Sequence, residues 1–110
     1  MLLAGVPGDS SNMLRAAHAD RVAAHYARDH GGVAPILVFP DQNGRFVGDT
    51  ECVDGPRGNA ETYLTVDVTH FVADRFAIAP KWAIVGFSEG GTCALTLALR
   101  HPDLDRKSVV

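Results

Sequence analysis

The sequence has 110 residues and contains no apolar run near the roughly 20 residues that span a bilayer, so we expect no membrane-spanning helix. Its 10 Lys and Arg are scattered and its net charge is −3, which argues against nucleic-acid binding. The first four residues are too few for a signal-peptide core and have no basic flank. Cysteine is scarce: its two copies allow one disulfide or two free thiols.

The remaining composition is typical of one globular domain. Hydrophobic residues make up 46% of the chain and charged residues 21%, which argues against disorder. Apolar runs alternate with helical patterns and predict an α/β fold with a parallel sheet and flanking helices. We expect strands at 1–4, 35–39 and 82–86, and helices from the N-cap candidates at 9–12 to about 29, at 61–76 and at 89–100.

Two of these predictions concern details of the helices and loops. In the second helix, one apolar stripe is expected to be buried, and it contains Leu64, Val68, Phe71 and Val72. Residues 40–60 form a long polar loop after the second predicted strand, at the carboxyl edge where α/β sheets bind ligands.

The most informative motif is G-x-S-x-G, from Gly86 to Gly90, between a predicted strand and a predicted helix. Ser88 would project from a sharp turn, for which the two glycines leave room. Free N–H groups at the helix start favour the oxyanion that forms when a serine attacks an ester carbonyl. Glu89 N–H is one candidate donor, and Val6 N–H, after the first strand, is the other. The alternative interpretation is a Gly-rich turn whose serine only caps the helix.

Residues 2–6, 61–65 and 82–91, with the helix that ends at His101-Pro102, resemble the actinobacterial putative-esterase family. This family includes the antigen 85 mycolyltransferases and the esterase D-like hydrolases. The resemblance implies an α/β-hydrolase fold with Ser88 as the nucleophile, and with Val6 and Glu89 as the oxyanion donors. It also implies a small-molecule or lipid acyl ester as substrate, no cofactor or metal, and a secreted or cell-envelope location. Ala4 replaces an Asp of the family's oxyanion loop.

The family's catalytic Asp or Glu and its His follow later strands. After Ser88 this sequence has one histidine, His101, 13 residues on, which is roughly 20 Å along a helix and beyond hydrogen-bond reach. We therefore expect residues 1–110 to be a partial α/β-hydrolase domain with three parallel strands. Two hypotheses follow: a serine esterase or acyltransferase core, or a catalytically inactive fragment that lacks the acid and the histidine.

Other features have plainer interpretations. Cys52 and Cys93 would both lie near the carboxyl edge of the sheet, so a disulfide and two free thiols are equally open. The residues at 41–44 are expected to form a turn with an Asx bond, with substrate contact as the alternative. The histidines at 18, 25 and 30 lack zinc-site spacing. A nucleotide-binding module is disfavoured because G-x-G-x-x-G is absent.

Overall fold

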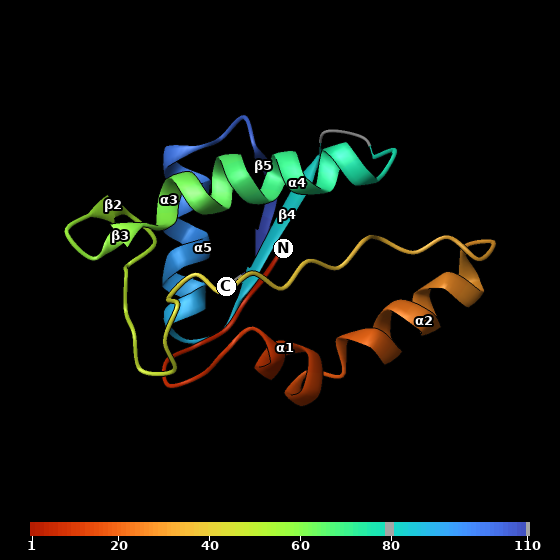
Figure 1. The fold of residues 1–110 in the computed structure, drawn as a ribbon. Helices are drawn as coiled ribbons and strands as arrows, with labels where there is room; N and C mark the ends of the chain where they lie inside the picture. The colour runs from red at the N-terminus through yellow and green to blue at the C-terminus, as the bar shows by residue number, and fades with distance from the viewer. Residues whose placement is uncertain (79–80, 110) are drawn as a thin grey trace.

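A computed structural model describes residues 1–78 and 81–109. It combines helices with a small parallel sheet (Figure 1). The elements, in chain order, are β1 (Leu2–Leu3), α1 (Ser11–Ala16), α2 (Ala19–Asp29), β2 (Asp54–Gly55), β3 (Gly58–Asn59), α3 (Ala60–Thr62), the π-helix η1 (Tyr63–Asp67), α4 (Val68–Arg75), β4 (Trp82–Gly86), α5 (Glu89–Arg100) and β5 (Asp105–Val109).

Two of the three predicted parallel strands are present, as β1 and β4. They pair in parallel with Leu2 opposite Val85, and β5 pairs in parallel with the other side of β4. The sheet order is therefore β1-β4-β5, while β2 and β3 form a separate antiparallel pair. The segment at 105–109 was not predicted to be a strand, because its charged residues interrupt the apolar run that is typical of a parallel strand.

The predicted strand at 35–39 is wrong. This segment is extended and passes beside β1 in Figure 1, where the backbone bond found among the described residues runs from the Leu2 N–H to the Val38 carbonyl (2.8 Å). Pro35 has no N–H to donate, and Ile36 is exposed, so the apolar run neither completes a hydrogen-bond ladder nor becomes fully buried.

The predicted first helix is also divided. His18 adopts the left-handed conformation (φ 47°) and separates α1 from α2. The apolar positions Val22 and Tyr26 of α2 are exposed, and Figure 1 shows α2 standing apart from the sheet. The helical spacing of these apolar residues therefore predicted that α2 is a helix, but the residues themselves are not buried.

The two later helices agree better with the sequence. Helical structure runs from Ala60 to Arg75 through α3, η1 and α4, and α5 has the predicted bounds. Leu64, Val68 and Val72 are buried as expected, whereas Phe71 is 54% exposed and lies under the Arg75 guanidinium. The core joins these helices to the sheet and consists of Met1, Leu3, Cys52, Leu64, Val68, Ile84, Cys93, Ala94 and Leu97. Among the described residues, no helix is long and apolar enough to span a membrane.

Candidate functional site

Ser88 occupies the sharp turn between β4 and α5. Its backbone has φ 56° and ψ −120°, a conformation that L-residues adopt rarely and that costs on the order of 1–3 kcal/mol. The residue is exposed at the carboxyl end of β4. A strained, solvent-facing serine at this position has the geometry that G-x-S-x-G motifs provide for a nucleophile.

The glycines around Ser88 are required by close backbone contacts. A Cβ on Gly86 would lie 1.9 Å from the Gly90 carbonyl oxygen, and a Cβ on Gly90 would lie 2.3 Å from the Leu3 carbonyl oxygen. A Cβ on Gly5 would lie 2.9 Å from the Phe87 carbonyl oxygen and 3.0 Å from the Ser88 Cβ. The segment after β1 therefore packs directly against the turn that carries Ser88.

Two backbone N–H groups remain available beside this turn. The N–H groups of Gly91 and Thr92 donate to the Ser88 carbonyl, and that of Gly90 donates to the Phe87 carbonyl. Within the part of the chain that the structure describes, the N–H groups of Val6 and Glu89 have no hydrogen-bond partner. These are the two donors that the sequence predicted for an oxyanion.

A hollow of about 340 Å³ opens beside Ser88. Its walls include the exposed apolar side chains of Phe87 (70% exposed) and Leu95 (50% exposed). The other lining residues are Gly86, Gly91 and Thr92.

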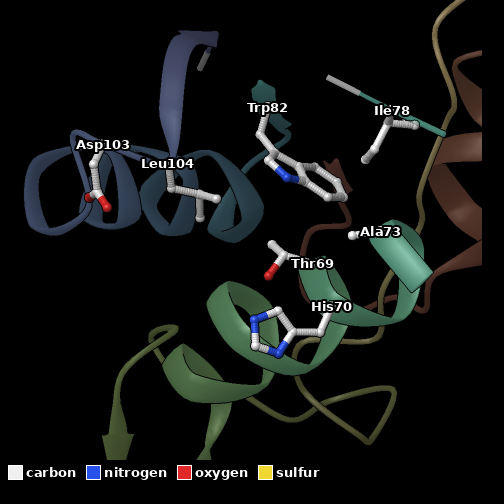
Figure 2. Close-up of a pocket in the computed structure, with 7 residues that line it drawn as sticks. All are labelled: Thr69, His70, Ala73, Ile78, Trp82, Asp103 and Leu104. Atoms are coloured by element: carbon white, nitrogen blue, oxygen red, sulfur yellow. The ribbon is translucent and has the colours of Figure 1, made fainter. Parts of the chain in front are cut away.

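A second hollow of about 280 Å³ lies at the opposite end of β4, around Trp82 (Figure 2). Thr69 points toward it, but the Thr69 hydroxyl donates to the carbonyls of Thr65 and Val66. The Thr69 hydroxyl is therefore engaged within its own helical segment, and the other polar side chains that line this hollow are those of His70, Trp82 and Asp103.

Sequence reasoning missed a polar network on the Glu89 carboxylate. Glu89 Oε2 accepts hydrogen bonds from Gln42 Nε2 and Asn43 Nδ2, both at 3.1 Å. Gln42 Nε2 also donates to the Ala4 carbonyl at 2.7 Å. The predicted Asx turn is present as well, since Asp41 Oδ1 accepts from the Asn43 N–H at 3.3 Å and also from the Gly44 N–H at 2.9 Å. The position of residues 41–44 after an apolar run was the available signal for this network.

Cys52 and Cys93 form a disulfide with a Cα–Cα distance of 5.3 Å, and both residues are buried. The structure thus decides a question that composition left open. The bond connects the long loop to α5, five residues after Ser88.

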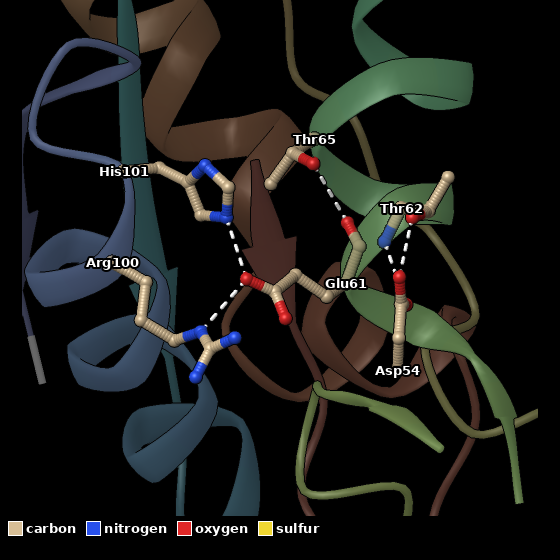
Figure 3. A network of polar contacts seen from close by, with 6 residues as sticks. All are labelled: Asp54, Glu61, Thr62, Thr65, Arg100 and His101. Atoms are coloured by element: carbon tan, nitrogen blue, oxygen red, sulfur yellow. Dashed lines mark hydrogen bonds and ion pairs between the residues drawn. The ribbon is translucent and has the colours of Figure 1, made fainter. Parts of the chain in front are cut away.

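The far end of α5 carries a separate ionic cluster (Figure 3). Glu61 Oε1 accepts from Arg100 Nε at 2.8 Å and lies 2.7 Å from His101 Nε2. These contacts, with Arg100 the stronger, hold the pKa of Glu61 below its ordinary value despite burial of the carboxylate. Asp54 extends the cluster by accepting from the Thr62 N–H at 2.9 Å. His101 is thus engaged by Glu61 at the end of α5 opposite Ser88.

The described residues give Ser88 no hydrogen-bonded histidine or carboxylate. No group of three or more His, Cys, Asp or Glu side chains among them could hold a metal ion. The structure therefore brings together Ser88 and the two predicted N–H donors, but not a general base.

These features define a strand–turn–helix in which a serine is presented with backbone donors. Consistent with this arrangement, residues 2–105 match the family described as putative esterase, and the chain belongs to that family.

A particular relative is an uncharacterized protein of Corynebacterium glutamicum, which is 34% identical over 106 residues. The alignment covers 94% of this chain and 25% of the relative, so the chain spans about a quarter of that protein's length. No solved structure matches the chain with significance.

Proposed function

We propose that this domain is the nucleophile-bearing core of a serine ester hydrolase or acyltransferase. In this proposal, β1, β4 and α5 are the part of an α/β-hydrolase fold that carries the oxyanion loop and the nucleophile turn. The observation that carries it is the exposed Ser88 at φ 56° and ψ −120°, with the N–H groups of Val6 and Glu89 unpaired beside it. Membership of the putative-esterase family supports the same reaction class.

The proposed reaction is acyl transfer through the serine. Ser88 Oγ forms a bond to the ester carbonyl carbon while its proton passes to a general base that the described residues do not supply, and the Val6 and Glu89 N–H groups stabilise the oxyanion. The C–O bond to the alcohol then breaks, and the alcohol leaves with a proton. Water or a second alcohol accepts the acyl group in the next step, which gives hydrolysis or transfer. Phe87 and Leu95 would contact the acyl chain of a small-molecule or lipid ester.

A second candidate is a domain that retains the serine turn but does not turn over substrate by itself. The contacts of Ser88 favour this second candidate, because the described residues place no imidazole beside Ser88, and His101 lies at the far end of α5 with Glu61. Removal of the triad partners generally leaves only weak residual rate enhancement from the oxyanion hole and binding.

Labelling with a fluorophosphonate, followed by peptide mass spectrometry, tests the nucleophile. We expect phosphonylation of Ser88 in the wild type and none in Ser88→Ala. Ser10→Ala is the matched control, because the Ser10 side chain makes no capping hydrogen bond and lies on another element. Equal labelling of Ser88→Ala and the wild type, or no labelling of either, would contradict the proposal.

Turnover of a p-nitrophenyl ester separates the two candidates. Ser88-dependent turnover together with labelling supports the enzyme core. Absence of both labelling and turnover supports the domain that has no activity of its own, because a serine without a base is a weak nucleophile.

A further inference from the structure

Gln42 is a buried amide that bridges two segments distant in sequence. Only 5% of its surface is exposed. Its Nε2 donates to the Ala4 carbonyl, 38 residues away, at 2.7 Å, and to Glu89 Oε2, 47 residues away, at 3.1 Å. Because an amide nitrogen carries two hydrogens, these two acceptors use its full donor capacity.

The two acceptors belong to the two halves of the site proposed above. Ala4 lies two residues before Val6, and Glu89 carries the other unpaired N–H in its own backbone. The Gln42 side chain is therefore a direct polar connection between the loop after β1 and the first residue of α5. Backbone packing contributes to the same separation, since the Phe87 N–H donates to the Leu3 carbonyl at 3.2 Å and Gly5 and Gly90 lie against the opposite segment; the Gln42 amide adds the side-chain contact between the two halves.

The Glu89 carboxylate depends on this connection. Its Oε1 atom is buried without a hydrogen-bond partner among the described residues, so Gln42 and Asn43 supply the donors that offset its desolvation through Oε2. The Asn43 side chain is itself fixed by a further hydrogen bond, because its Oδ1 accepts from the Thr50 N–H at 3.0 Å. Charge-assisted bonds of this kind are stronger than bonds between neutral groups, and they fix the carboxylate in place.

We infer that Gln42 is a positioning residue, whose amide sets the separation and orientation of the Val6 and Glu89 N–H groups for the oxyanion. This inference rests on the proposed function. If Gln42 had a purely structural role, its substitution would lower the free energy of unfolding but leave the reaction of the folded protein unchanged. Displacements of about 1 Å at a reacting centre cost up to about 100-fold in rate, so a measurable effect is expected.

The test measures phosphonylation of Ser88 by a fluorophosphonate as a maximal rate constant, kinact, and an apparent affinity, KI. Gln42→Met keeps the length and burial of the side chain but removes both donors. We expect kinact to fall about 10- to 100-fold with KI changed by less than about threefold, because the contact acts on the oxyanion and not on the initial complex. All rates are measured well below the unfolding transition of each variant.

Two further variants control for folding. Thr50→Val removes a hydroxyl that donates to the Gln42 carbonyl at 3.1 Å and to Asn43 Oδ1 at 3.2 Å, so it loosens the same loop while the Gln42 amide keeps its acceptors on Ala4 and Glu89. We expect its kinact to stay within about threefold of the wild type. Gln42→Asn keeps an amide that is one methylene too short to reach both acceptors, and we expect a loss like that of Gln42→Met even if the Met variant folds poorly.

The outcomes are distinguishable. If the wild type labels at Ser88 and Gln42→Met and Gln42→Asn label at the same kinact, the inference is overturned while the proposed function stands. If Thr50→Val loses as much kinact as Gln42→Met, the effect comes from a loosened loop and the inference is also overturned. If the wild type does not label at Ser88, the proposed function fails and the inference fails with it.

Discussion

The substitution Gly86→Ala tests the steric basis of the serine turn. The new Cβ would lie 1.9 Å from the Gly90 carbonyl oxygen and 2.1 Å from its carbonyl carbon, whereas real Cβ atoms essentially never approach closer than 3.0 Å. The obstacle is backbone in the first turn of α5, so no side-chain rotation can relieve it. Overpacking commonly costs about 1–3 kcal/mol, and we expect at least about 3 kcal/mol here because the end of β4 must move away from α5.

Urea unfolding followed by far-UV circular dichroism measures this loss, with Gly55→Ala as the matched control. A Cβ on Gly55 would meet nothing within 4 Å, so its free energy of unfolding should stay within about 0.5 kcal/mol of the wild type. Phosphonylation of Ser88 in the folded fraction of Gly86→Ala should also be slower, because the shift moves the nucleophile. A loss below about 1 kcal/mol for Gly86→Ala, or equal losses for both variants, would refute the steric reasoning.

Two further predictions concern the covalent and ionic links of α5. The double variant C52A/C93A opens a loop with a sequence separation of 41, so its free energy of unfolding in urea should fall by about 4 kcal/mol; an unchanged urea midpoint would contradict this. Glu61→Gln should cost about 1–2 kcal/mol at pH 7, because the half-exposed Arg100 loses its charged acceptor. Since the pKa of Glu61 is lowered in the folded state, its contribution is present above the ordinary glutamate pKa and is lost as pH falls through the folded value. The free energies of unfolding of the two proteins should therefore converge as pH falls below the ordinary range of a glutamate, and a gap that is constant with pH would contradict the assignment.

Local patterns predicted the elements that place Ser88. The apolar run of β4, the two glycines of the motif and the helical period of α5 lie within 20 residues of one another and need no distant partner to be recognised. The extended segment at 35–39 shows the limit of such patterns. An apolar run indicates burial, but a strand also needs a neighbour that accepts and donates along its length. Among the described residues, β1 bonds to this segment through the Leu2 N–H and forms no ladder with it.

Contacts between distant residues could not be predicted in this way. Gln42 looked like part of an ordinary turn, and nothing in its neighbourhood indicates that Ala4 and Glu89 lie beside it. The pairing of Cys52 with Cys93 was likewise only one of two possibilities, since a cysteine count does not specify distance. Exposure was also difficult to predict: Phe71 fits the buried stripe of its helix, yet it packs with Arg75 at the surface.

The contacts of α5 divide into two groups with different expected consequences. Near Ser88, the Leu3 carbonyl packs against Gly90, the disulfide holds Cys93, and the amide of Gln42 holds Glu89. At the other end, the Glu61 cluster binds Arg100 and His101, about 18 Å away along a helix of 12 residues.

Both groups should contribute to stability, but only the first can influence the geometry of the turn, because positional shifts decay through a packed helix that keeps its own hydrogen bonds. We therefore expect Glu61→Gln to lower the free energy of unfolding while leaving phosphonylation of Ser88 unchanged, and Gln42→Met to slow phosphonylation beyond any effect of its stability. Measuring kinact of the two variants at temperatures equally far below their unfolding transitions tests this difference directly. Equal losses of kinact in Glu61→Gln and Gln42→Met would contradict this expectation. They would show that a change at the far end of α5 alters the geometry of the Ser88 turn as much as the loss of the Gln42 amide does.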